Sequence, residues 1–305
     1  MTDTSANSAV IGFVGLGVMG GPMCRNMALK HAGEVLAFDT QDAAFEAVAG
    51  TKARRVASLA ELAAQADVVF LSLPAGPVVE AVCLGAQGLT SGPRKPAVIV
   101  DLSTTTVATA RAVAQRLAAL GVQFADAPVA RTREAAQRGA LSIMVGAPAA
   151  LFARIAPWLG YTATDVTLCG EVGCGQVVKL VNNALVFEHT LALAEMMVLG
   201  ERAGVAPETL LDAVSKGSGD SFVLRNHGRK AMLPRQFPDK SFSPEYVLKD
   251  IGCVLELAKD LGVATRVTEL AQRCYAATAQ AGFSGRYFPS VIEVIDRNLD
   301  VATKE

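Results

Sequence analysis

The chain has 305 residues, a formal net charge of -1 from 28 basic and 29 acidic residues, and a hydrophobic content of 51%. This length is sufficient for two domains with separate cores, and the composition is that of a globular protein rather than a disordered one. The charge is balanced and no long run of like charges occurs, so we expect no nucleic-acid partner.

The mean hydropathy of +0.34 raises the question of a membrane segment. The longest charge-free stretch, Thr4 to Cys24, contains five glycines and a proline, so it does not resemble a spanning helix or a secretory signal. The six cysteines form no CxxC pair and no cluster with the three histidines. We therefore expect a cytoplasmic protein with no metal site, no disulfide and no membrane partner.

The first apolar run, Val10 to Val14, leads directly into Gly15-Leu16-Gly17-Val18-Met19-Gly20, which matches the pattern GxGxxG. A helix is predicted from about Gly21 to Lys30, followed by a second strand from Val35 to Asp39. Asp39 stands 19 residues after Gly20, close to the offset expected for a dinucleotide-binding unit. Glycines in an unrelated turn are the alternative, but the strands and the helix around the motif favour the cofactor loop.

Each part of this motif has a physical task. Gly15 permits the tight turn, Gly17 lets the backbone approach a pyrophosphate, and Gly20 allows the helix to pack on the strand. Leu16, Val18 and Met19 complete the cofactor loop. Asp39 is expected to accept hydrogen bonds from the adenosine ribose and to repel a 2'-phosphate, and no arginine follows at 40 or 41. The predicted cofactor is therefore NAD rather than NADP.

Further strands are predicted at 68–73, 98–102, 124–129, 141–145 and 165–168, with helices between them at 59–66, 78–83 and 106–120. This alternation predicts an α/β domain with a doubly wound, mostly parallel Rossmann sheet. Ligands bind outside the carboxyl ends of such strands, so Leu73, Pro74 and Thr104 are candidate cofactor contacts. A turn-forming role for Pro74 and a capping role for Thr104 are the alternatives.

After the last of these strands the pattern becomes helical. A long apolar helix is predicted from Gln176 to Ala203, and further helices at 207–215, 222–232, 244–261, 264–281 and 290–299. We expect residues 1–172 to form the NAD-binding domain and 173–305 an all-helical domain for substrate binding and dimerisation, joined by the long helix. The apolar helices suggest a homodimer or homotetramer, although helix surface buried within one chain looks the same.

The stretch Gly173 to Asn183 begins the long helix. It places Gly175, Lys179 and Asn183 at i, i+4 and i+8, on one helix face. A glycine, an amine and an amide in a row can lie against a flat ligand and present a proton donor to it. Taken alone, the stretch is better explained as a glycine-led helix start with a surface lysine and a satisfied asparagine. Together with the glycine-rich N-terminal motif, its place at the predicted domain junction favours a site.

Four stretches occur in the order of a known family's signatures: GLGVMGGPMCRN (15–26), DAPVART (126–132), GCGQVVKLVNN (173–183) and Lys249-Asp250-Ile251. They resemble the β-hydroxyacid dehydrogenase family, which includes 3-hydroxyisobutyrate dehydrogenase, tartronate semialdehyde reductase and relatives of 6-phosphogluconate dehydrogenase. The resemblance implies that Lys179 is the catalytic acid/base, that Asn183 assists catalysis and holds substrate, and that Lys249 contacts the cofactor.

The substrate loop departs from the common family pattern DAPVSGG, because Ala130, Arg131 and Thr132 replace Ser-Gly-Gly. The serine hydroxyl is absent, and Arg131 offers a planar fork of donors to carboxylate, sulfonate or phosphate oxygens. The Arg-Thr pair is similar to that of sulfolactaldehyde reductase and certain succinic semialdehyde reductases. All three residues are candidate substrate contacts; the alternative for Arg131 is exposure to solvent or pairing with Glu134.

The resemblance implies an NAD-dependent oxidoreductase that moves hydride reversibly between the nicotinamide and a small anionic aldehyde or β- or γ-hydroxy acid. Substrates of the 3-hydroxyisobutyrate, tartronate semialdehyde, succinic semialdehyde and sulfolactaldehyde types all fit. Two alternatives stay open. Oxidative decarboxylation needs a second acid/base group and usually a larger substrate, whereas the helical part here is short. A non-catalytic NAD-binding scaffold does not require Lys179, which is present.

Overall fold

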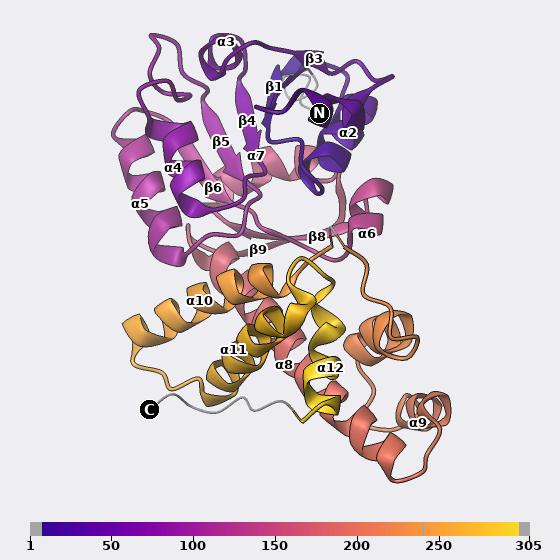
Figure 1. Cartoon of the computed structure of the whole chain (residues 1–305). Helices are drawn as coiled ribbons and strands as arrows, with labels where there is room; N and C mark the ends of the chain where they lie inside the picture. The colour runs from indigo at the N-terminus through magenta and orange to yellow at the C-terminus, as the bar shows by residue number, and fades with distance from the viewer. Residues whose placement is uncertain (1–7, 240, 299–305) are drawn as a thin grey trace. The chain divides into compact units, whose positions relative to one another are not determined.

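The computed structural model describes residues 8–239 and 241–298, and its packing divides the chain into two compact units after Lys179 (Figure 1). Unit 1 runs to Lys179 and unit 2 begins at Leu180. The strands, all in unit 1, are β1 (Ile11–Val14), β2 (Val35–Phe38), β3 (Arg54–Arg55), β4 (Val68–Leu71), β5 (Val98–Asp101), β6 (Gln123–Asp126), β7 (Val129–Ala130), β8 (Leu141–Gly146) and β9 (Ala163–Gly170).

Within the described residues these strands form one sheet of nine, in the order β3-β2-β1-β4-β5-β6-β8-β7, with β9 paired to β8. The pairs from β3 to β6 are parallel, β8 runs antiparallel to β6 and β7, and β9 is parallel to β8. The strand order reverses at β1, which lies between β2 and β4. The expectation of a doubly wound, mostly parallel sheet is confirmed.

Helices cover both faces of this sheet. They are α2 (Gly20–Lys30), a 3-10 helix (Asp42–Val48), α3 (Leu59–Ala63), α4 (Gly76–Leu84), α5 (Val107–Ala118), α6 (Arg133–Arg138) and α7 (Ala149–Leu159). Because strand side chains alternate, Phe13 enters the core under α2, α6 and α7, whereas Val14 enters the core under α3, α4 and α5. Both cores consist mainly of aliphatic side chains, as expected for strands buried on both faces.

Unit 1 differs from the predicted elements in some element ends and in several elements that were not predicted. The strand expected at 124–129 ends at Asp126, because Pro128 has no N–H to donate, and the chain resumes pairing as β7. The two-residue strand β3 and the helices α6 and α7 were not predicted. The helix expected at 59–66 is shorter, ending at Ala63, whereas α4 extends one residue beyond Cys83.

Unit 2 is helical, and the end of β9 is joined to it through α8 (Cys174–Arg202), which spans the division between the units. The remaining helices are α9 (Pro207–Val214), a π-helix (Leu224–Met232), α10 (Pro244–Leu261), α11 (Arg266–Thr278), a π-type turn (Ala279–Phe283), a 3-10 turn (Phe288–Ser290) and α12 (Val291–Asp296). Phe187 of α8 lies at the centre of the core, with ring centroids of Tyr275 and Phe288 6.1 and 5.8 Å away.

The largest differences from the expected helix ends of unit 2 occur in two helices. The helix expected to Ala281 ends at Thr278, and Gly282, with φ of 93°, turns the chain. The helix expected at 290–299 is α12, which ends at Asp296; Leu299 lies outside the described residues.

Helix α8 is long and apolar enough to cross a membrane by length and composition, the one such helix in the described part of the chain. The core helix of a globular protein passes the same test, and 44% of its most apolar window is buried within the protein. This is therefore weak evidence for a membrane span.

Candidate functional site

The loop after β1 depends on glycine at two positions for different reasons. Gly15 has φ of +94°, and a methyl group on it would lie 2.2 Å from the carbonyl oxygen of Ser72. A methyl group on Gly20 would lie 2.0 Å from the carbonyl oxygen of Gly15. Both positions are therefore closed to any side chain, and the loop passes tightly between β4 and the start of α2.

Gly17 differs from both, because a methyl group there would meet no protein atom within 4 Å. Gly17 and Val18 are exposed, and the first turn of α2 contains no acidic residue. An open approach to backbone N–H groups at the start of an eleven-residue helix fits an anionic pyrophosphate. The loop thus has the space and the donors that a dinucleotide needs.

Asp39 is fixed at the end of β2 by two backbone groups. Its Oδ2 accepts from the N–H of Leu16 at 2.6 Å, and its Oδ1 accepts from the N–H of Gln41 at 2.8 Å. The N–H of Gly15 donates to the carbonyl of Phe38 at 2.9 Å. The acid is therefore attached to the glycine loop itself, at the position where a ribose is expected.

The loops after β4 and β5 meet at the same edge of the sheet. The N–H of Leu73 donates to Oγ of Ser103 at 2.9 Å, so the two loops are hydrogen-bonded to each other. Leu73 and Thr104 are half-buried, and Pro74 is exposed. The structure thus places Leu73, Pro74 and Thr104 after the carboxyl ends of the neighbouring strands β4 and β5, and β4 lies beside β1, where the strand order reverses.

The start of α8 is held by a buried carboxylate. Asp126, at the end of β6, accepts from the N–H groups of Gly173 at 2.6 Å and Gln176 at 2.8 Å. Burial raises the pKa of Asp126, and the two N–H donors oppose that rise. Lys179 follows one turn later and is buried. Asp126 and Gln176 were not predicted as site residues.

Gly175 corrects one expectation about this helix. A methyl group on it would lie 2.5 Å from the carbonyl oxygen of Met144 and 2.8 Å from Oδ2 of Asp126. The side of Gly175 on which a side chain would stand therefore faces the sheet of unit 1, and protein atoms occupy that space. The glycine serves the close packing of α8 on β8, and the idea that it lies against a flat ligand is wrong.

The predicted substrate loop has an unusual backbone. Ala130 is buried in β7 and pairs with Ser142, and Arg131 adopts φ of +85°, a conformation that glycine adopts far more readily. Arg131 stands where the common family pattern has glycine. Thr132 accepts from the N–H of Ala135 at 3.3 Å and so caps α6.

The guanidinium of Arg131 is directed at β9 and its neighbourhood. It donates to Oδ2 of Asp165 at 2.7 Å, to Oγ1 of Thr164 at 2.8 Å and to the carbonyl of Ala140 at 2.8 Å. The hydrogen bond from Thr164 and the pairing with Arg131 lower the pKa of Asp165. Glu134, the partner considered from the sequence, pairs with Arg138 instead.

In unit 2, the carboxylate of Asp250 contacts two of the predicted site residues, Asn183 and Lys249. Its Oδ2 accepts from Nδ2 of Asn183 at 2.7 Å, and its Oδ1 lies 3.1 Å from Nζ of Lys249. The side chain of Asn182 donates to Oδ1 of Asn183 at 3.1 Å. Asp250 was part of the fourth sequence signature, yet its role as the acceptor that orients Asn183 was not predicted.

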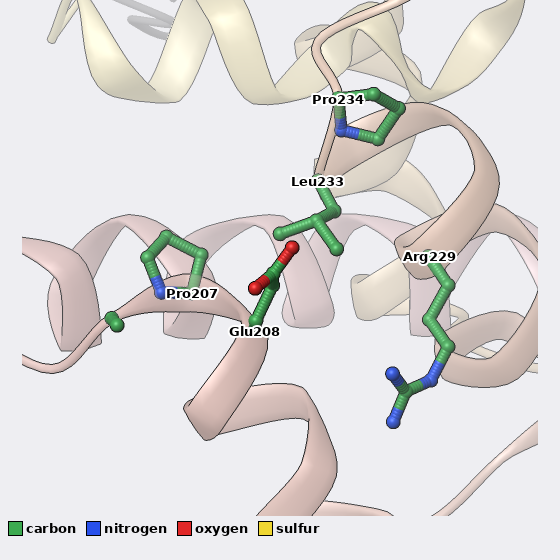
Figure 2. Close-up of a pocket in the computed structure, with 6 residues that line it drawn as sticks. Pro207, Glu208, Arg229, Leu233 and Pro234 are labelled. Atoms are coloured by element: carbon green, nitrogen blue, oxygen red, sulfur yellow. The ribbon is translucent and has the colours of Figure 1, made fainter.

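Metal-binding groups and surface pockets are two further kinds of site that the described residues could form. Among residues 8–239 and 241–298, no group of three or more His, Cys, Asp or Glu side chains is arranged to hold a metal ion. A surface pocket of about 380 Å³ in unit 2 is lined by Ala206, Pro207, Glu208, Arg229, Leu233 and Pro234, five of which are labelled in Figure 2. None of these is a predicted site residue.

Known dehydrogenases are similar to this chain along most of its length. Residues 10–170 match the family model for the NAD binding domain of 6-phosphogluconate dehydrogenase, and residues 173–295 match that for the NAD-binding of NADP-dependent 3-hydroxyisobutyrate dehydrogenase. The chain is 34% identical to 2-(hydroxymethyl)glutarate dehydrogenase of Eubacterium barkeri over 97% of each chain. It is 34% identical to 3-hydroxyisobutyrate dehydrogenase of Pseudomonas aeruginosa over 89% of this chain and 92% of that one.

A solved structure shows the same fold. The 3-hydroxyisobutyrate dehydrogenase of Mycobacterium tuberculosis, determined with L-serine, matches with a TM-score of 0.84 and 28% identity, over 94% of this chain and 99% of that one. The two family models together match most of the chain, and both describe nicotinamide-cofactor domains. The chain therefore belongs to the β-hydroxyacid dehydrogenase family, of the 3-hydroxyisobutyrate dehydrogenase type, and is a nicotinamide-dependent hydroxyacid dehydrogenase.

Proposed function

We propose that this enzyme transfers hydride reversibly between NAD(H) and a small anionic aldehyde or β- or γ-hydroxy acid, with Lys179 as the general acid/base. The observation that carries the proposal is the anchoring of the start of α8, one turn before Lys179, to the loop that follows β5. That loop lies at the sheet edge where a dinucleotide binds in this fold. An amine held beside that edge is suited to proton transfer.

The Gly15–Gly20 loop and Asp39 would hold the cofactor, whose nicotinamide would supply or accept the hydride. The open space at Gly17 and the N–H groups at the start of α2 fit its pyrophosphate. During reduction, Nζ of Lys179 donates a proton to the carbonyl oxygen of the aldehyde. During oxidation, it accepts the proton from the hydroxyl group.

For unit 2 we propose the roles that the family resemblance implies. Asn183 binds the polar end of the substrate, and Lys249 contacts the cofactor. Asp250 supports both roles, because its carboxylate fixes the amide of Asn183 and pairs with Lys249. Two hydrogen bonds orient the side chain of Asn183: it donates to Asp250 at 2.7 Å and accepts from Asn182 at 3.1 Å.

The proposed preference for NADH over NADPH depends on Asp39. A fixed carboxylate beside the ribose repels a 2'-phosphate, and Asp39→Asn keeps the shape while removing the charge. We expect the ratio of kcat/KM for NADH over NADPH to fall by about tenfold or more in this variant. Steady-state kinetics with both cofactors measures the ratio.

The matched control is Glu46→Gln, which removes an equal charge from an exposed position in the 3-10 helix after β2. Its cofactor ratio should equal that of the wild type. A wild-type enzyme that uses NADPH as well as NADH would contradict the proposed preference.

The substrate class is tested by NADH oxidation with succinic semialdehyde, sulfolactaldehyde, tartronate semialdehyde and methylmalonate semialdehyde. We propose that the substrate anion replaces Asp165 at the guanidinium of Arg131, because this exposed ion pair is readily exchanged. Arg131→Ala should then raise KM for the preferred aldehyde by about tenfold. Asp165→Asn, which removes the competing anion, should lower it.

The two variants separate the anion-binding role from a structural one. If Arg131 only holds the loop, both substitutions alter stability in the same direction and leave the order of preference among the four aldehydes unchanged. Consumption of none of the four would reject the proposed substrate class, and carbon dioxide release with a hydroxy acid would indicate the decarboxylating branch.

A further inference from the structure

Gln176 is fully buried in the first turn of α8, and both the oxygen and the nitrogen of its side-chain amide form hydrogen bonds. Its Oε1 accepts from the N–H of Thr105 at 3.1 Å, and its Nε2 donates to the carbonyl of Ser103 at 2.8 Å. Its own N–H donates to Oδ2 of Asp126 at 2.8 Å. One residue thus connects the start of α8 with the ends of β5 and β6.

The loop that Gln176 holds is itself connected to the neighbouring strand end. Oγ of Ser103 accepts from the N–H of Leu73 at 2.9 Å, and the N–H of Ser103 donates to Oδ1 of Asp101 at 3.0 Å. Ser103 and Thr105 are buried. A continuous series of hydrogen bonds therefore leads from the loop after β4, through the loop after β5, to α8.

The chemistry of this position requires an amide. It must accept from one backbone N–H and donate to one backbone carbonyl, and glutamine carries both functions in one planar group. A carboxylate supplies only acceptors, and an aliphatic side chain supplies neither. Either replacement leaves a buried backbone group without its partner.

We propose that Gln176 is a positioning residue for Lys179, which lies three residues later on the same side of α8. By holding the first helical turn to the loop Ser103–Thr105, its amide sets the distance of the lysine amine from the sheet edge where the cofactor binds. This inference rests on the proposed function of Lys179 as the proton donor. A displacement of about 1 Å at such a site costs on the order of a hundredfold in rate.

The test compares Gln176→Leu and Gln176→Glu with the wild type at temperatures well below unfolding. Gln176→Leu should lower kcat by about tenfold to a hundredfold. Gln176→Glu should be equally impaired at high pH and should recover as the pH falls, because a protonated carboxyl group again offers one donor and one acceptor. The kcat of Gln176→Glu divided by that of wild type, plotted against pH, is the readout.

The control is His31→Leu, which removes a buried polar side chain from unit 1 away from these loops. Nε2 of His31 lies 2.7 Å from the carbonyl oxygen of Ala9. His31→Leu should reduce stability and leave kcat within twofold of wild type. A flat pH ratio for Gln176→Glu, or a Gln176→Leu variant with the kcat of His31→Leu, overturns the positioning role even where Lys179→Ala is inactive. Full activity in Lys179→Ala overturns the proposed function itself.

Discussion

Replacing Lys179 with alanine is expected to lower kcat by about a hundredfold to ten-thousandfold. Without the amine, negative charge builds on the carbonyl oxygen with no proton donor at hand. The cofactor contacts proposed in unit 1 belong to the loops after β1, β2, β4 and β5, so NADH should still bind with a dissociation constant within about threefold of wild type. Steady-state kinetics on the preferred aldehyde and fluorescence titration of NADH measure the two effects separately.

The control for charge removal is Lys259→Ala, an exposed lysine near the end of α10. Its kcat should match that of the wild type. Added methylamine should restore part of the lost rate in Lys179→Ala, because a small amine can enter the vacated volume and donate the proton. A kcat for Lys179→Ala close to that of wild type would mean that the proton comes from another group.

Gly175→Ala is expected to have the second large effect, although it adds only one methyl group. That group would lie 2.5 Å from the carbonyl oxygen of Met144 and 2.8 Å from the N of Gly146, which are backbone atoms that cannot rotate away. The start of α8 must therefore move off β8, at a cost of about 3 kcal/mol. We expect a midpoint of thermal unfolding lower by roughly 5–10 °C and a reduced kcat.

Gly252→Ala is the matched control, because a methyl group at this position in α10 would meet no atom within 4 Å. Replacing a helical glycine with alanine in open space should raise stability by up to about 1 kcal/mol. Calorimetry measures the midpoint of thermal unfolding of both variants. A Gly175→Ala protein as stable as the wild type would show that the helix tolerates the extra volume and that the close packing is not required.

Short-range spacing explains why the first strand, the glycine turn, the helix after it and the second strand could be predicted from the sequence. Gly15, Gly20 and Asp39 fall within one strand-helix-strand unit, where chain geometry fixes their separation. Helix α10 was predicted with its observed ends, Pro244 and Leu261, because an N-terminal proline and a following glycine mark both boundaries. In these cases, residues close together in the sequence determine where the turn and the helix ends form.

The hydrogen bonds that organise the start of α8 could not be predicted in this way. Gln176 lies 73 residues from Ser103 and 50 from Asp126, and only the folded sheet brings these groups together. Helical spacing showed which side chains share a face with Gly175, but it does not show what that face contacts. The ion pair of Arg131 with Asp165, 34 residues later, depends on the pairing of β8 with β9 for the same reason.

The backbone of Arg131 has a consequence for how this loop changes during evolution. A side chain at φ of +85° costs about 1 kcal/mol relative to glycine, so mutation to glycine relieves strain while removing the contacts to Thr164 and Asp165. Asp165 then loses its cationic partner, so an acidic residue is no longer required at that position. Positions 131 and 165 should therefore covary among relatives, with the acid retained where arginine stands and lost where glycine does.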